Sequence, residues 1–195
     1  KNGKSITKPV HICYCHTPPH FYWRKYEEYL KNPGFRPKWL VRLGLKLLVK
    51  PLRKRDYDAA QSVDYFIANS SHIQNDIKKY YGRDSTVIAP PVDVEKFATT
   101  KNSVAKNKRS GFITWGRLVP YKRVDLIIKA CNQIPLPLTV VGTGPMLPEL
   151  KKIAGPTITF TGYATHEQIL EAARRAEAFI FAAEEDFGIA PVEAM

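Results

Sequence analysis

Short runs of β-branched and apolar residues alternate along the chain with longer stretches in which apolar residues recur every three or four positions. A short apolar run is typical of a buried strand, and the longer spacing is typical of a helix with one apolar face. Strands are expected at 10–15, 63–69, 85–90, 111–116, 138–142, 157–163 and 178–183, and helices at 122–134, 146–154 and 165–176. This alternation predicts an α/β fold with parallel sheets.

The stretch 98–110 separates the expected elements into two groups. It is polar, charged and without periodicity, so we expect a linker or an exposed loop between two α/β domains that meet at a cleft. Each group has fewer strands than a doubly wound domain usually has. The chain is therefore expected to be a piece of a longer one, with two incomplete domains over residues 1–105 and 106–195.

Composition narrows the class of protein. No apolar run approaches the roughly 18 residues that a membrane-spanning helix needs. Cys13, Cys15 and Cys131 cannot form a disulfide framework, and the C-x-C pair lacks the further ligands of a zinc site. We expect a reducing compartment and no bound metal.

The formal net charge of +12 is concentrated in the first half of the chain. Residues 1–109 hold 22 Lys and Arg against 9 Asp and Glu, whereas residues 110–195 hold 8 against 9. A basic half of this kind can serve nucleic acid, an anionic membrane or a phosphorylated substrate, and composition leaves all three open.

The segment 111–130 combines a strand, a glycine turn and a helix, with Arg117 and Lys122 around the turn. Cationic side chains and free backbone N–H groups at one place favour a bound phosphate. The alternative is that both are solvated surface charges.

A second glycine turn follows the strand at 138–142. Gly142 and Gly144 resemble the start of a dinucleotide-binding fingerprint, but Leu147 stands where its third glycine is expected. A tight strand-to-helix turn that ends at Pro145 is favoured instead.

Two glutamates flank the turn before the last expected helix, which begins near Gly188. Glu185 precedes this turn and Glu193 follows it, at a strand end where open α/β sheets bind ligands. A carboxylate would repel phosphate but accepts hydrogen bonds from the hydroxyls of ribose or a sugar. The alternatives are an exposed loop acid for Glu185 and a partner of the helix dipole for Glu193.

A basic stripe lies on the helix expected within 36–56. Lys38, Arg42, Lys46 and Lys50 recur every four residues among Trp and Leu side chains. Such a helix can lie in a membrane interface against anionic lipid. The alternative is a surface helix whose apolar side packs into its own domain.

Four motifs in this order and spacing resemble glycosyltransferase family 4 of the GT-B fold, in which two Rossmann-like domains face a cleft. They are G-R-L-x-x-x-K at 116–122, V-G-x-G-P at 141–145, F-x-G-Y at 160–163 and E-D-F-G-I-x-P-V-E-A-M at 185–195. The segments 14–23, 58–70 and 87–97 resemble the acceptor-side domain of its mannosyltransferase-like members. The resemblance makes residues 1–105 part of the acceptor domain and 106–195 part of the donor domain.

This resemblance implies a retaining hexosyltransferase that works without a metal or cofactor. Arg117, Lys122 and the backbone at Phe187 and Gly188 would meet the charge of the leaving diphosphate. The donor site would also include Gly116 and Gly142, with Gly162 and Tyr163 bordering the base, Glu185 contacting the donor sugar and Glu193 the ribose. Neither glutamate is assigned as a nucleophile, because front-face attack assisted by the leaving phosphate is implied.

His16 is the candidate from the first half of the chain. It follows the first expected strand, where the family places a histidine against the donor sugar. The alternative is a satisfied core or loop histidine.

The implied partners are a nucleotide-sugar donor, with mannose as a candidate sugar, and a sugar or lipid-linked saccharide acceptor, but no nucleic acid. A role in glycan, lipopolysaccharide or lipid-linked saccharide synthesis is expected, in the cytoplasm and at the inner face of the membrane if the basic helix binds lipid. The rival is a non-catalytic basic module that binds nucleic acid or membrane through residues 1–109, which leaves the pattern from Glu185 to Glu193 unexplained. A phosphorylase or epimerase on the same fold is a third reading.

Overall fold

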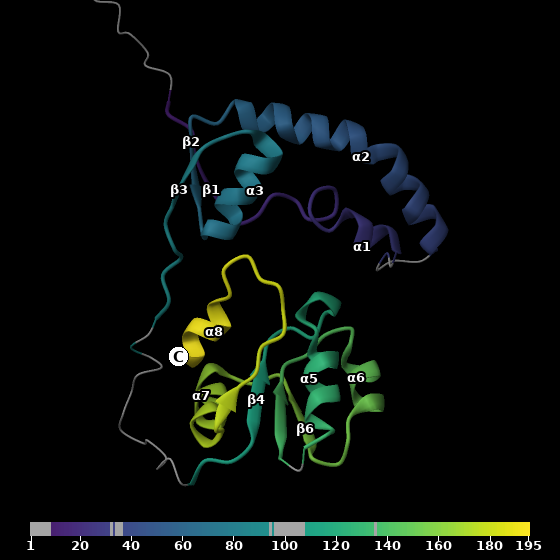
Figure 1. The fold of residues 1–195 in the computed structure, drawn as a ribbon, viewed down its shortest axis with the longest axis vertical. Helices are drawn as coiled ribbons and strands as arrows, with labels where there is room; N and C mark the ends of the chain where they lie inside the picture. Colours follow the sequence, from purple (N-terminus) through teal and green to yellow (C-terminus); the bar gives the residue numbers. More distant parts are fainter. Residues whose placement is uncertain (1–8, 32, 34–36, 94, 96–107, 135) are drawn as a thin grey trace, which may run out of the picture. The chain divides into compact units, whose positions relative to one another are not determined.

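The computed structural model describes residues 9–31, 33, 37–93, 95, 108–134 and 136–195. The chain divides into two compact units, Lys1–Pro90 and Pro91–Met195. Each unit contains one parallel sheet with helices packed on it (Figure 1). The domain boundary expected at 105–106 lies within residues 96–107, which are outside the described residues, and it stays a prediction.

The first unit has a three-stranded parallel sheet in the order β1-β2-β3. Its strands are β1 Ile12–Cys15, β2 Tyr65–Ala68 and β3 Ser85–Val87, and its helices are α1 Tyr26–Lys31, α2 Lys38–Gln61 and α3 Ser71–Tyr81. Phe66 and Ala68 of β2 pack against Ile73 and Ile77 of α3 in the core. The side chain of Ser70 caps α3 by accepting the N–H of Ile73 at 3.2 Å, so the helix starts directly after β2.

A carboxylate joins the segment after β1 to two helices of this unit. Asp56 of α2 accepts hydrogen bonds from Trp23 Nε1 at 2.6 Å and from the Tyr81 hydroxyl of α3 at 2.7 Å. Burial raises the pKa of the Tyr81 phenol, and its hydrogen bond to Asp56 raises it further, so the phenol remains a donor at neutral pH. This network fixes the chain that leaves the carboxyl end of β1.

The second unit has a four-stranded parallel sheet in the order β6-β5-β4-β7. The strands are β4 Phe112–Trp115, β5 Leu138–Val141, β6 Ile158–Gly162 and β7 Ala178–Phe179, and the helices are η3 Pro120–Lys122, α5 Val124–Cys131, α6 Leu147–Ile153, α7 His166–Arg175 and α8 Ile189–Ala194. All seven expected strands are present, although β7 is shorter than the 178–183 that the sequence predicts.

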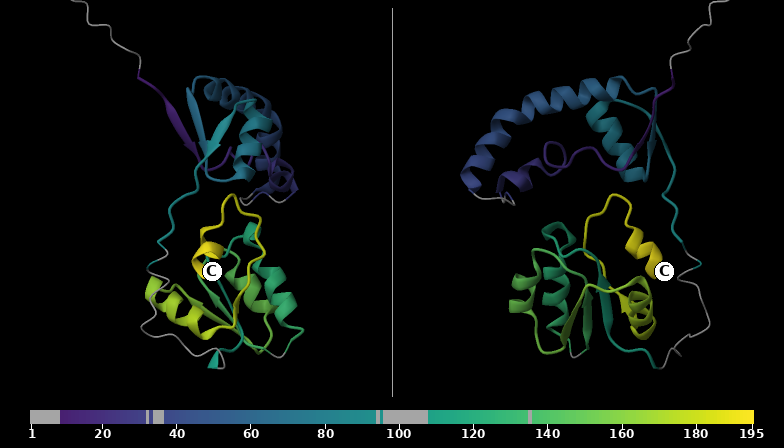
Figure 2. Two further views of the ribbon diagram at one scale, coloured as in Figure 1. Left: turned by 60° about the vertical axis from the view of Figure 1, so that its left-hand side comes forward. Right: turned by 180° about the vertical axis from the view of Figure 1, so that it is seen from behind.

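Helices cover both faces of this second sheet. Leu138 and Val140 of β5 point into a core with residues of α5 and α6, whereas Ile113 and Val141 lie against α7. Figures 1 and 2 show α7 on the opposite side of the sheet from α5 and α6. The unit is therefore doubly wound.

Glycines allow the loops after β4 and β5 to touch through their backbones. Gly116 donates its N–H to the Val141 carbonyl at 3.0 Å, and Leu118 donates to the Thr143 carbonyl at 2.8 Å. Gly142 has φ +132°, and a Cβ there would lie 2.0 Å from the Gly116 carbonyl oxygen. The turn at 142–144 thus fits the favoured strand-to-helix turn, because its glycines serve backbone packing.

Gly142→Ala should lower the free energy of unfolding of the second unit by about 3 kcal/mol, because it adds backbone strain to a steric clash. Gly162→Ala is the matched control: Gly162 has φ +73° but open space around its Cβ position, so it should cost only about 1 kcal/mol. Denaturant unfolding of both variants measures the difference. Equal losses would contradict the packing role of Gly142.

Candidate functional site

The strand order of the second unit marks one place on its sheet. In chain order β4 comes first, yet it lies between β5 and β7. The chain therefore passes from β4 to β5 on one side and later returns to β7 on the other side. The crevice outside the carboxyl ends of two such strands is where open α/β sheets bind ligands. The loops that begin after Trp115 of β4 and Phe179 of β7 enter this crevice.

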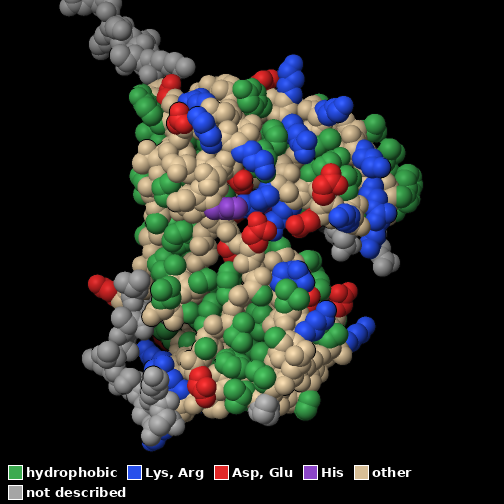
Figure 3. Space-filling view, in the orientation of Figure 1, with side chains coloured by type: hydrophobic (Ala, Val, Ile, Leu, Met, Phe, Trp, Pro, Cys, Tyr) green, Lys and Arg blue, Asp and Glu red, His purple; other side chains and the backbone are tan. Residues whose placement is uncertain are grey.

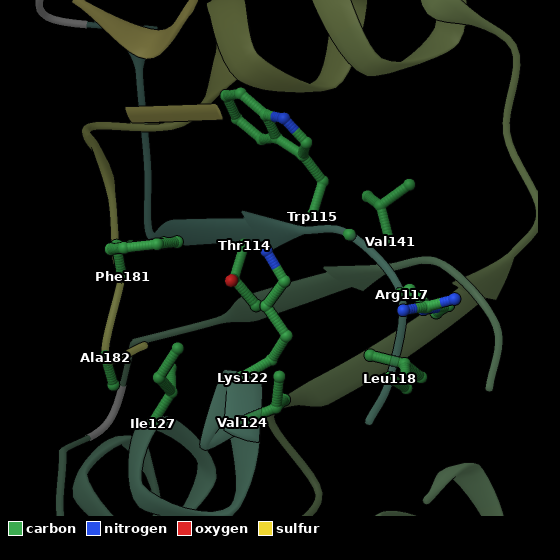
Figure 4. Close-up of a pocket in the computed structure, with 11 residues that line it drawn as sticks. Thr114, Trp115, Arg117, Leu118, Lys122, Val124, Ile127, Val141, Phe181 and Ala182 are labelled. Atoms are coloured by element: carbon green, nitrogen blue, oxygen red, sulfur yellow. The ribbon is translucent and has the colours of Figure 1, made fainter. Parts of the chain in front are cut away.

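A small pocket lies at the carboxyl end of β4 (Figure 4). Its lining comes from β4, from the loop and helices that follow it, and from the segment after β7: Thr114, Trp115, Gly116, Arg117, Leu118, Lys122, Val124, Ile127, Val141, Phe181 and Ala182. The structure therefore brings Gly116, Arg117 and Lys122 together, as the sequence predicts.

Lys122 extends from η3 into this pocket toward Thr114 (Figure 4). Its ammonium group forms an ion pair with the Glu185 carboxylate, and both side chains are only about a fifth exposed, at 22% and 21%. Lys122 Nζ also lies 5.6 Å from the centre of the Tyr121 ring and 5.8 Å from that of Phe181. An ion pair and two aromatic faces thus hold the lysine in place.

Arg117 lines the same pocket but is more exposed to solvent than Lys122. Its side chain is exposed to solvent, while the adjacent Leu118 is buried and anchors the loop. Sequence reasoning treats the two cations alike, but the structure separates an exposed guanidinium from an enclosed ammonium group.

The start of α5 carries its own charge pair beside Lys122. Arg123 has φ +50° and precedes the helix, and its guanidinium bonds Asp125 in the first turn at 3.0 and 3.2 Å. The hydrogen bond from Arg123 is the main cause that lowers the pKa of the Asp125 carboxyl. Asp125 already pairs with Arg123 at this helix start, and among the described residues that line the pocket the cations are Arg117 and Lys122.

The segment after β7 places the two glutamates differently. Glu185 lies in the loop before α8 and reaches Lys122, whereas Glu193 is half-buried within α8. Between them Gly188 is buried, has φ +84° and precedes the first turn of α8, as the sequence predicts. The exposed-acid alternative is wrong for Glu185, because it is enclosed and paired with Lys122.

The end of β6 supplies the residues expected beside a base. Gly162 has φ +73°, and its carbonyl accepts the N–H of Gly142 at 2.8 Å. Tyr163 follows with 83% of its surface exposed. An exposed aromatic ring at a strand end can stack on a flat ligand.

His16 lies in the first unit, directly after β1. Its side chain is exposed, with the ring edge-on to Tyr14 at a centroid distance of 5.2 Å. Its backbone carbonyl accepts a hydrogen bond from Asn69 Nδ2 at 3.1 Å, which fixes this strand end. The core form of the alternative for His16 is therefore wrong; its loop form stays open, and its expected catalytic role stays a prediction.

Sequence reasoning missed the aromatic pair around Lys122. Tyr121 is its chain neighbour, but Phe181 comes from the segment after β7, some sixty positions away. The available signal was the pair Phe179 and Phe181, which fits a strand equally well.

The Lys122–Glu185 pair should contribute to stability. In a double-mutant cycle with Lys122→Met and Glu185→Gln, we expect a coupling of about 1 kcal/mol, because both groups are largely shielded from water. The matched control is Lys129 with Asp125, a more exposed pair at 4.0 Å, where the coupling should be near zero. Denaturant unfolding measures both cycles, and equal couplings would show that the enclosed pair has no special strength.

Known proteins resemble this chain in sequence family or in fold. The family described as "Glycosyl transferases group 1" matches residues 95–195. A comparison with curated proteins found no match. Several solved structures are similar to the chain, all below 25% sequence identity.

Three of these structures illustrate the similarity. Anabaena Alr3699/HepE in complex with UDP-glucose has a TM-score of 0.63 at 17% identity over 93% of this chain and 63% of its own. Sucrose-phosphate synthase from Thermosynechococcus elongatus has 0.62 at 16% identity over 95% and 47%. The apo lipopolysaccharide outer core galactosyltransferase WaaB has 0.56 at 19% identity over 68% and 40%.

The chain thus spans less than two thirds of the length of each of these three structures. The likeness concerns the α/β fold, and the family match covers the unit that holds the pocket. The chain belongs to the glycosyl transferases group 1 family and has its GT-B fold.

Proposed function

We propose that the protein transfers a sugar from a nucleotide diphosphate sugar to a hydroxyl group of an acceptor. The observation that carries this proposal is the ion pair between Lys122 and Glu185, which follow β4 and β7, the two strands whose carboxyl ends border the crevice. The donor presents an anionic diphosphate next to a neutral sugar rich in hydroxyl groups. A site for it needs a cation and a carboxylate side by side, which this pair supplies.

Donor binding would exchange the partners within this pair. Lys122 moves from the Glu185 carboxylate to the diphosphate, and Glu185 then accepts hydrogen bonds from hydroxyls of the donor sugar. Arg117 is exposed at the pocket and provides the second cation. The backbone N–H groups at Phe187 and Gly188 complete the anion site.

The reaction replaces one bond at the anomeric carbon by another. The bond to the diphosphate oxygen breaks, and its electron pair leaves with the phosphate, where Lys122 and Arg117 stabilise the charge. The acceptor oxygen bonds to the same face of the sugar, and its proton passes to the leaving phosphate oxygen. The configuration is retained, and this proposal assigns no nucleophilic role to Glu185 or Glu193.

Other residues would bind the rest of the donor. Glu193 accepts hydrogen bonds from the ribose diol, and Tyr163, with Gly162 behind it, borders the base. Gly116 and Gly142 give the loops the close approach that shapes the site. His16 of the first unit would contact the donor sugar.

The substrate class rests on the family and on similar proteins. A HepE structure contains UDP-glucose, which supports a nucleotide diphosphate hexose as the donor. The family resemblance of the first unit favours mannose, and a sugar or lipid-linked saccharide as the acceptor. Turnover with a panel of GDP-, UDP- and ADP-hexoses by the intact protein decides between these donors, and turnover of none of them would overturn the proposal.

Arg117→Ala and Lys122→Ala should each lower turnover by a factor of about 10², because each removes a charge that stabilises the leaving diphosphate. Lys129→Ala, on the exposed side of α5, is the matched control and should leave turnover unchanged. Initial rates at saturating donor measure the effect, with thermal unfolding to confirm that each variant is folded. Near-normal turnover in both pocket variants would remove the diphosphate assignment.

The two glutamates should respond differently to two ligands. Glu193→Ala should weaken binding of both the free nucleoside diphosphate and the intact donor, each by about 1.5–3 kcal/mol, since both contain the ribose. Glu185→Ala should weaken only the donor by that amount. The free nucleotide lacks the donor sugar that Glu185 would contact. In Glu185→Ala, Lys122 would also be free of its ion pair and could still bind the diphosphate.

Titration calorimetry of the two variants with both ligands tests this difference. Glu184→Ala is the matched control, because Glu184 is exposed, whereas its neighbour Glu185 is enclosed and paired with Lys122. Equal losses for both ligands in Glu185→Ala would refute its assignment to the sugar. No loss for either ligand in Glu193→Ala would return that residue to a partner of the helix dipole.

A further inference from the structure

Helix α2 exposes apolar side chains that its own unit does not cover. Its first eleven residues contain five large apolar side chains that are 47% to 67% exposed: Trp39, Leu40, Leu43, Leu47 and Leu48. The alternative in which this apolar side packs into the domain is therefore wrong for these residues. None of the described helices is long and apolar enough to cross a membrane.

The exposed apolar side is not the side that faces the core. Leu40, Leu43 and Leu47 follow one another at three- and four-residue spacing and share one side of the helix. Val49 is buried and Leu52 half-buried, and both lie on a different side. The helix thus has one side for the unit and a second apolar side exposed to solvent.

Cations adjoin this second side. Residues 38–55 contain seven Lys and Arg and no Asp or Glu. Lys46 and Lys50 are exposed one turn apart, next to the leucine row. Figure 3 shows Lys and Arg side chains beside hydrophobic ones where α2 lies.

One member of the basic stripe has a structural task. The Arg42 guanidinium donates hydrogen bonds to the carbonyls of Leu30 and Lys31 at the end of α1, both at 2.8 Å. It therefore fixes the start of α2 against α1 and holds the exposed leucines in a defined orientation. Lys46 and Lys50 are exposed beside the leucine row.

We propose that this surface of α2, made of Trp39, Leu40, Leu43, Leu47, Lys46 and Lys50, binds the interface of an anionic lipid bilayer. A helix with Leu and Trp on one side and Lys beside them inserts its apolar side below the headgroups, while its lysines contact anionic lipid. Nucleic acid on this surface would leave its four apolar side chains in water. A protein partner fits less well, because lysine is depleted in protein interfaces.

Vesicle co-sedimentation of the intact protein tests this surface. At low salt it should bind phosphatidylcholine vesicles that contain phosphatidylserine, and bind pure phosphatidylcholine far more weakly. Lys46→Gln with Lys50→Gln should weaken binding about fivefold per lysine, and this loss should shrink as salt is raised. Leu43→Ser with Leu47→Ser should weaken it at least about tenfold at every salt concentration.

Two matched variants control for charge and apolar area elsewhere. Lys151→Gln with Lys152→Gln removes two exposed lysines from α6, and Ile153→Ser removes an exposed apolar side chain. Both should bind vesicles as the unchanged protein does. Anionic vesicles should also shift the Trp fluorescence to shorter wavelength, and Trp39→Phe should abolish that shift while Trp23 and Trp115 remain.

Three results would overturn the proposal. The first is equal binding to neutral and anionic vesicles, and the second is binding that the α2 variants and the control variants weaken alike. The third is self-association without lipid that Leu43→Ser with Leu47→Ser abolishes, since a second copy of the chain would then cover the surface. None of these results bears on the donor site, because the α2 variants leave the pocket residues unchanged.

Discussion

Parallel strand pairing in the second unit determines where its chemistry can occur. Because β5 and β7 both run parallel to β4, all their carboxyl ends meet at one edge of the sheet. The chain leaves β4 toward β5 and returns to β7 on the other side, which opens a crevice between the two loops. Lys122 and Glu185 are far apart in sequence, and this topology is what allows them to form an ion pair.

The pair also explains how a folded site can keep charged groups ready for a ligand. For a partly enclosed lysine, the two aromatic rings would offset only part of the lost hydration. Glu185 compensates it, and a ligand that offers both an anion and hydroxyl groups can replace the pair without leaving either side chain unsatisfied. The same contact therefore serves the stability of the unit and, in the proposed function, the selection of the donor.

The first unit combines two different surfaces on one framework. The network of Asp56 with Trp23 and Tyr81 fixes the segment after β1, whose first residue is the exposed His16. Along the start of α2, by contrast, leucines are exposed to solvent although the unit has a core of its own. The seven Lys and Arg of residues 38–55 thus lie on the helix that exposes this apolar surface, which a surface for nucleic acid alone would not need.

Strand and helix periodicities and the spacing of four motifs are local properties, so the sequence predicted most of the secondary structure and the family, but not α1 or α3. Seven strands were predicted in place, and the motifs located Arg117, Lys122, Glu185 and Gly188 near one another. Which groups make contact could be seen only in the tertiary structure, because periodicity does not specify the partners of a side chain across a sheet. The Lys122–Glu185 pair, the position of Phe181 beside it and the clash that requires Gly142 all depend on loops from different strands. The exposure of the α2 leucines could not be predicted either, since the sequence pattern of an apolar helix side is the same whether that side faces a core or water.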